Sequence, residues 1–276
     1  MRSDSPKATK WILAAVLIFA CLVQLLPFWV TVTTALKART DLSSQWAFPF
    51  ANLTFENFGT AMDQGNIVRA IINSGVVTIG ATVLICVLGA LAAYPLARRR
   101  TLGNNIVLGF VVSLMMVPPL SILVPLYSFM NKIGGLNTYW GAIVVLTAGQ
   151  LPLAIFLYAN FIRALPTSID EAATIDGASH LTRIFRVIFP LLKPVTATVI
   201  IMCAVNVWNE FALSGFLLTK PERQTIAPAI ASFFGSQSNN LGAAAAGSLM
   251  AVAPILVAYL FLQRYFISGM VAGSGK

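Results

Sequence analysis

The sequence predicts an all-α polytopic membrane protein with six transmembrane helices. Of its 276 residues, 58% are hydrophobic and only 10% are charged, whereas about 25% of residues are charged in soluble domains. The mean hydropathy is +0.82. Uncharged stretches recur along the chain, and each long one can hold a span of about 20 residues. A soluble protein could bury an apolar core of this size, but it would not need uncharged runs of that length.

The six expected spans lie within these uncharged stretches. Residues 1–10 are expected to form a cytoplasmic N-terminal segment, and residues 11–276 one transmembrane domain. The first uncharged run, Trp11 to Leu36, exceeds the roughly 7–15 apolar residues of a signal peptide, so we predict a retained helix. The predicted spans are 11–34, 69–96, 105–130, 139–162, 195–218 and 243–264.

The distribution of basic residues predicts the orientation of the chain. Lys and Arg near the ends of membrane helices are retained on the cytoplasmic side. If the N-terminus lies inside, twelve of the eighteen basic residues fall in cytoplasmic segments, including Arg98, Arg99 and Arg100. We therefore expect a multi-pass protein of the bacterial inner membrane with both termini in the cytoplasm.

Prolines interrupt the third predicted span. Pro118, Pro119 and Pro125 each remove a backbone donor, and membrane helices tolerate this only where neighbours or water satisfy the freed groups. We expect this span to be kinked and packed inside the bundle.

The longest polar segment expected inside, residues 163–194, predicts two short helices. Ser168 and Glu171 have the spacing of a capping box, which would start a helix at Ile169. Gly177 should end it, because glycine readily adopts the left-handed conformation. Apolar residues at helical spacing predict a second helix, with Arg183 and Arg186 facing lipid headgroups or solvent; they are Leu181, Ile184, Phe185 and Ile188.

This segment resembles the EAA loop of the membrane subunits of binding-protein-dependent ABC importers. Its pattern is EAA, three residues, Gly, nine residues, Ile, one residue and Leu-Pro. The matching residues are Glu171, Ala172, Ala173, Gly177 and Pro190, with Val187 and Phe189 at the usual Ile and Leu positions. Asp176 and Ala178 extend the match towards the carbohydrate branch, similar to the second maltose permease.

The resemblance implies the transmembrane domain of a type I ABC importer. In that family the loop is a coupling helix seated in an ATPase subunit, which implies that Glu171, Ala172, Ala173, Asp176, Gly177 and Ala178 contact such a partner. It also implies a second permease subunit and an extracytoplasmic sugar-binding protein, with ATP and Mg bound by the ATPase subunits. The alternative is an amphipathic interfacial helix without a partner.

Other function classes lack their motifs in this sequence. It contains no GxxxxGK[ST] phosphate-binding loop. His180 is the only histidine, so neither HExxH nor a multi-histidine metal site can be built. The basic residues are scattered between apolar spans, which does not favour nucleic-acid binding. We therefore expect neither an enzyme nor a metal site, and no cofactor of the chain's own.

The fifth predicted span carries candidate residues of the substrate pathway. Asn206, Asn209 and Glu210 are three or four positions apart, so they should share a helix face. A polar face within a membrane is expected to meet protein or water, and such groups can hydrogen-bond a sugar. Equally, the patch could hold this helix against a companion subunit.

The resemblance implies ATP-driven sugar import by alternating access, with this chain forming half of the pathway. The companion subunit can carry the main sugar contacts in this family. Because specificity there depends largely on the external binding protein, the alternative of a non-sugar solute stays open: a polyol, glycerophosphodiester, amino acid or peptide.

Overall fold

The computed structural model describes residues 7–41, 43–50, 52–99, 101–235 and 240–274. Residues 1–6 of the expected N-terminal segment and Arg100 of the basic group lie outside the described residues. The described chain is helical, with an isolated antiparallel bridge between Lys37 and Leu53. It divides into two units: unit 1 comprises residues 1–67 and 230–252, and unit 2 comprises residues 68–229 and 253–276.

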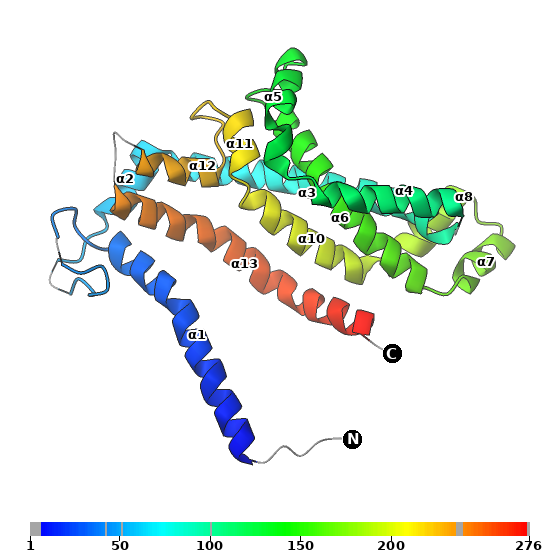
Figure 1. Ribbon diagram of the computed structural model, residues 1–276, viewed down its shortest axis with the longest axis horizontal. Coiled ribbons are helices and arrows are strands. Elements are labelled where there is room, and N and C mark those ends of the chain that lie inside the picture. Colours follow the sequence, from blue (N-terminus) through cyan, green and yellow to red (C-terminus); the bar gives the residue numbers. More distant parts are fainter. Residues whose placement is uncertain (1–6, 42, 51, 100, 236–239, 275–276) are drawn as a thin grey trace. The chain divides into compact units, whose positions relative to one another are not determined.

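The long helices match four of the predicted spans (Figure 1). Their bounds are α1 Lys7–Ala35, α3 Ile67–Arg98, α6 Tyr139–Ala164 and α13 Leu241–Ser274. The shorter elements are α2 Glu56–Gly65, α4 Leu102–Ser113, η1 Leu114–Met116, η2 Pro119–Ile122, α5 Leu123–Lys132, α7 Ser168–Ile175, α8 His180–Thr182, η3 Arg183–Ile188, α9 Phe189–Leu191, α10 Lys193–Trp208, α11 Ala212–Leu217, α12 Ile226–Ala231 and η4 Ser232–Phe234.

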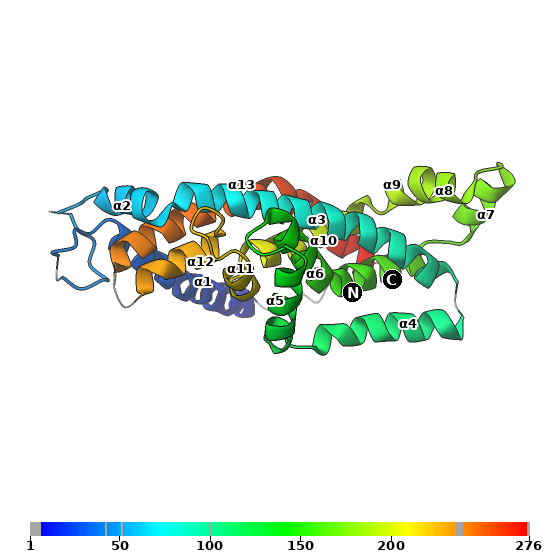
Figure 2. The same ribbon diagram turned by 90° about the horizontal axis from the view of Figure 1, so that it is seen from above.

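Two further spans exist if each bent pair of segments counts as one. Leu102–Met116 meets Pro119–Lys132 at 91°, and Arg183–Leu191 meets Lys193–Trp208 at 73°. The first break confirms the kink predicted at Pro118 and Pro119, and α5 turns away from the line of α4 there (Figure 2). The prediction that this span packs inside the bundle was wrong within the single chain, because Met116 is 83% exposed and Val124 is 74% exposed.

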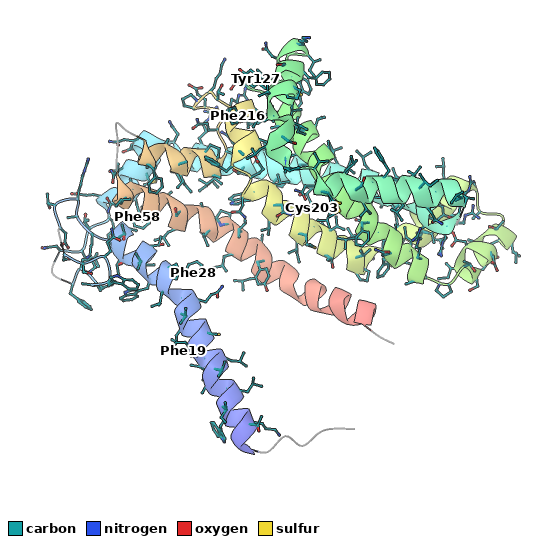
Figure 3. The ribbon with its side chains drawn as sticks, viewed as in Figure 1. Phe19, Phe28, Phe58, Tyr127, Cys203 and Phe216 are labelled. Carbon is teal, nitrogen blue, oxygen red and sulfur yellow. The ribbon has the colours of Figure 1, made fainter. Side chains whose placement is uncertain are left out.

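In unit 1, α1 presents its apolar side chains outward. Phe19 and Phe28 are exposed (Figure 3), as are most residues from Trp11 to Trp29. Near the end of α1 the chain folds back, and the buried Asn57 donates from Nδ2 to the carbonyls of Ala35 and Lys37 at 2.9 and 2.7 Å. These bonds hold α2 beside the end of α1, since each satisfies a carbonyl group with no helical partner.

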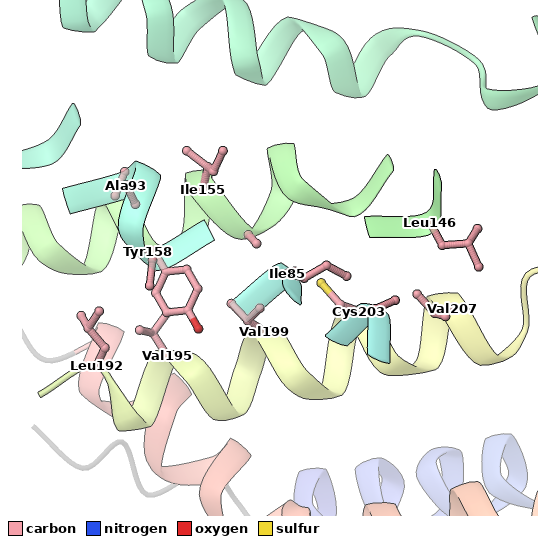
Figure 4. Close-up of a cluster of buried hydrophobic side chains, with 14 of the residues drawn as sticks. Ile85, Ala93, Leu146, Ile155, Tyr158, Leu192, Val195, Val199, Cys203 and Val207 are labelled. Carbon is pink, nitrogen blue, oxygen red and sulfur yellow. The ribbon is translucent and has the colours of Figure 1, made fainter. Parts of the chain in front are cut away.

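The core of unit 2 is formed by α3, α6 and α10. Tyr158 of α6 packs against Val195 and Val199 of α10, with Ile85 of α3 beside them (Figure 4). The backbones of α3 and α6 approach closely at Gly89, where an added Cβ would lie 3.0 Å from the Cβ of Ala154. Small residues permit such approaches in membrane helices. This core is the scaffold on which the loop 163–194 is mounted.

Candidate functional site

The first short helix of the loop is α7, at one end of unit 2 (Figure 2). It begins at Ser168, so Ser168 is its first helical residue and Thr167 the N-cap, whose side chain makes no capping bond. The predicted capping box was therefore wrong. The amide of Glu171 instead donates to the carbonyl of Thr167 at 3.1 Å, and the acidic residues Asp170 and Glu171 favour the positive end of the helix dipole.

The end of α7 confirms the role predicted for Gly177. This residue has φ +77°. Its amide donates to the Thr174 carbonyl at 3.1 Å, and the Ala178 amide donates to the Ala173 carbonyl at 2.9 Å. This pair of bonds is a Schellman motif, which ends a helix by satisfying its last carbonyls.

The second short helix differs from the prediction. Residues 183–188 form a π-helical segment between α8 and α9, and a wider turn changes which residues share a face. Ile184 and Ile188 are buried as predicted, but Leu181 is 64% and Phe185 48% exposed. Arg183 was expected to face headgroups or solvent; it packs against α7 instead, with its Nη1 donating to Thr174.

The coupling residues predicted from sequence lie on α7 and in the turn that ends it, and they differ in exposure. Ala173 is buried, Ala178 is partly buried, and Glu171, Ala172, Asp176 and Gly177 are exposed. Ile175 is 87% exposed on the same helix and was missed by sequence reasoning. An exposed isoleucine next to Asp176 and one turn after Glu171 offers an apolar contact that a polar partner rim could surround.

Sequence reasoning also missed Asp170, which faces the rest of unit 2. Its Oδ1 accepts from Tyr94 Oη at 2.6 Å. Its Oδ2 lies 2.8 Å from Nη2 of Arg98, and the two side chains are only 15% and 11% exposed. A cavity of about 400 Å³ adjoins them and is also lined by Arg99, Glu171 and Arg183. The available signal was position, because Asp170 is three residues before Ala173 and so lies on the same face of α7.

The predicted pathway residues do not share one helix face. The helix α10 ends at Trp208, and Asn209 is its C-cap. The Glu210 carboxylate lies beyond it and accepts from the amides of Leu213 and Ser214 at 2.8 and 2.6 Å. A short carboxylate-capped turn has replaced the continuous helix that we expected, because the side chain satisfies the free amides of α11. Asn206 is exposed on α10, and its Nδ2 lies 3.5 Å from Oε1 of Gln150 on α6.

One groove within unit 2 is apolar. It has a volume of about 630 Å³ and lies between α3, α10 and residues 254–259 of α13. Its few polar side chains include Thr78, Thr82 and Thr196, and its described lining does not include the three predicted pathway residues. Sugar hydroxyls buried without hydrogen-bond partners would cost several kcal/mol, so this groove does not have the chemistry of a sugar site. Among the described residues, no cluster of three or more His, Cys, Asp or Glu could hold a metal ion.

Comparison with known proteins places this architecture among transport proteins. Residues 85–271 match the family of the binding-protein-dependent transport system inner membrane component. The chain is 42% identical over 277 residues to the melibiose/raffinose/stachyose import permease protein MelC of Bacillus subtilis, with 100% of both chains covered. It is 31% identical to the maltodextrin transport system permease protein MdxG of the same organism, with 92% of each covered.

A solved structure has the same fold. It is a bacterial ABC transporter involved in the import of the acidic polysaccharide alginate, and one of its chains superposes with a TM-score of 0.77. The two chains are 20% identical, and 96% of this chain and 99% of that one are covered.

Proposed function

Because this chain belongs to the family of binding-protein-dependent transport system inner membrane components, we propose that it is the membrane-spanning permease subunit of an ATP-driven oligosaccharide importer. Its relatives in this family are transport permeases and not enzymes. The observation that carries the proposal is the full-length 42% identity to an import permease for melibiose, raffinose and stachyose. Several other relatives are also named for sugars.

The loop 163–194 is proposed as the coupling site. The exposed Glu171, Ala172, Asp176 and Gly177 and the flanking Ala173 and Ala178 would seat α7 in a separate ATPase subunit, which binds ATP and Mg. Helix α7 is only eight residues long, and its Schellman ending gives it a fixed exit angle. A short, rigidly ended helix is suited to transmit a displacement.

The transmembrane domain, residues 11–276, is proposed to form half of the pathway together with a second permease subunit. The exposed Asn206 and Asn209 and the half-buried Glu210 are proposed to line that pathway, since they lie outside the apolar groove of unit 2. An extracytoplasmic sugar-binding protein would deliver the solute. Both termini are proposed to be cytoplasmic.

Deletion of the gene in its own host tests this function. Uptake of labelled raffinose, maltodextrin, trehalose and methionine is measured before and after deletion, with a plasmid copy as the control. We expect loss of uptake of at least one oligosaccharide, unchanged methionine uptake and full recovery with the plasmid. Loss of methionine uptake with all sugars unaffected would instead assign the chain to a non-sugar importer.

A further inference from the structure

Two adjacent carboxylates of α7 have different surroundings. Glu171 is exposed, and among the described residues it forms no ion pair. The neighbouring Asp170 is largely buried and contacts side chains of other elements: Tyr94 and Arg98 on α3, and Arg183 in η3 at 4.0 Å. Glu171 is thus available to another protein, whereas Asp170 is engaged within its own chain.

Arg98 extends these contacts to a third element. Its Nη1 donates to the carbonyls of Ile162 and Leu165 at 3.0 and 2.8 Å, at the C-terminal end of α6. The last four carbonyls of a helix lack partners within it. The Arg98 guanidinium therefore caps α6 with one nitrogen and pairs with Asp170 of α7 through the other. Arg98 is itself the last residue of α3, so this side chain links three helices.

Arg183 adds contacts to α7 from η3. Its Nη1 donates to Oγ1 of Thr174, one turn after Asp170, and Thr174 Oγ1 donates to the Asp170 carbonyl at 2.7 Å. Both turns of α7 are therefore fixed to side chains of neighbouring elements. Bonds that involve ionised groups are stronger than neutral ones, particularly away from bulk water.

We propose that Asp170, held by Arg98 and Tyr94, is the positioning residue through which displacement of α7 is passed to α3 and α6. This inference rests on the proposed coupling function of α7. It assigns Glu171 and Asp170 separate tasks: Glu171 contacts the ATPase, and Asp170 ties the helix to the membrane core. If the contacts of Asp170 with Arg98 and Tyr94 were weakened, the ATPase could still bind α7 and hydrolyse ATP. The displacement of α7 would then move only the loop and would not reach α3 and α6.

The test compares isosteric variants in the reconstituted transporter with all its subunits. Asp170→Asn removes the charge and retains the shape, and Glu171→Gln makes the same change one residue later. We measure ATPase association, ATP hydrolysis and solute transported per ATP. For Asp170→Asn we expect normal association and continued hydrolysis, with transport per ATP reduced at least about fivefold, the lower end of typical coupling effects. Glu171→Gln should weaken association with the ATPase subunit, which Asp170→Asn should not.

Arg98→Gln removes the ion-pair partner of Asp170, and Arg163→Gln is the control for this change. Arg163 also ends α6, but its guanidinium contacts Leu96 and Asn105 and not α7. Groups that act as a pair are non-additive, so Asp170→Asn combined with Arg98→Gln should reduce transport per ATP no further than Arg98→Gln alone, which also removes the bonds to the end of α6. Arg163→Gln should leave this ratio as in the wild type.

Three outcomes would overturn the inference: an unchanged ratio in Asp170→Asn, loss of association in that variant, or simple addition of the two changes. Tyr94→Phe is a milder variant in case the charge changes prevent folding, since it removes only the hydrogen bond from Tyr94 to Asp170. It should lower transport per ATP partially. Failure of the proposed function is separately visible, because the wild-type complex would then show no ATP-dependent solute transport at all.

Discussion

Space for a side chain does not constrain position 177, because a Cβ added to Gly177 would meet nothing within 4 Å. Its φ of +77° is the constraint, and a left-handed conformation costs an ordinary residue roughly 1–2 kcal/mol. Gly177→Ala should therefore weaken binding of the ATPase subunit by about 5- to 30-fold, the factor that corresponds to such an energy.

The matched control for Gly177 is Gly103→Ala, which also adds a methyl group in open space but within the helix α4. Affinity is measured with the purified chain in lipid nanodiscs. Gly177→Asn should bind better than Gly177→Ala, since asparagine tolerates the left-handed region. Equal affinity of Gly177→Ala and the wild type would show that the exit angle of α7 does not matter.

Glu210 combines a structural contact with a proposed place in the pathway. Its carboxylate accepts from two backbone amides, and an unsatisfied buried donor costs about 1–3 kcal/mol. Glu210→Gln keeps one acceptor oxygen, so we expect assembly with altered uptake. Glu210→Leu keeps neither and should reduce uptake more than it reduces complex formation.

Uptake divided by the amount of assembled complex separates the two roles of Glu210. Glu222→Gln is the control, because Glu222 is an exposed carboxylate in the segment after α11. If the Glu210 variants transport normally whenever they assemble, Glu210 has a structural role and no role in the pathway.

Among the helices, the pair α3 and α6 depends on the close approach at Gly89. Gly89→Leu places a side chain against Ala154 and Tyr158, and overpacking of this kind costs about 1–3 kcal/mol. The purified chain in detergent should unfold at a lower temperature than the wild type. Gly75→Leu, on the same helix with nothing within 4 Å of an added Cβ, should unfold near the wild-type temperature; equal losses in both variants would contradict the packing described for α3.

Helices were predictable from sequence where one signal dominated. The uncharged runs located α1, α3, α6 and α13, because length and hydropathy alone decide such spans. Pro118 and Pro119 marked the break before η2, and Gly177 marked the end of α7. The end of α10 at Trp208 was missed, because the Glu210 carboxylate accepts from the amides of Leu213 and Ser214 and this local bonding competes with helix continuation within an otherwise apolar stretch.

The coupling loop was predictable in outline and not in its contacts. The spacing of Glu171 and Gly177 pointed to a short helix, yet the capping box assigned to Ser168 did not form. The position of Asp170 on the same face as Ala173 was a signal, but its partner could not be predicted, because Tyr94 lies 76 positions away in sequence and the pairing arises from tertiary structure. The π-helical turn of η3 likewise has no periodicity signal in so short a segment.

For the whole molecule, the orientation in the membrane is open to direct measurement. The distribution of basic residues predicts that residue 99 is cytoplasmic and residue 56 external. Single cysteines at these exposed positions, in a background without Cys21, Cys86 and Cys203, are treated with a membrane-impermeant maleimide in intact cells with a permeabilised outer envelope. Position 56 should react and position 99 only after the inner membrane is opened; the reverse pattern would invert the topology.

The measurement that tests the proposed function most directly is ATP-driven uptake by the purified transporter. This chain, its companion permease, the ATPase subunits and the binding protein are reconstituted into proteoliposomes, and accumulation of labelled raffinose is followed with ATP or a non-hydrolysable analogue. Omission of this chain alone is the control. We predict accumulation that requires ATP hydrolysis, the binding protein and this chain together. Equal accumulation without this chain would contradict its assignment as a sugar permease subunit. So would a complete complex that hydrolyses ATP but accumulates no oligosaccharide.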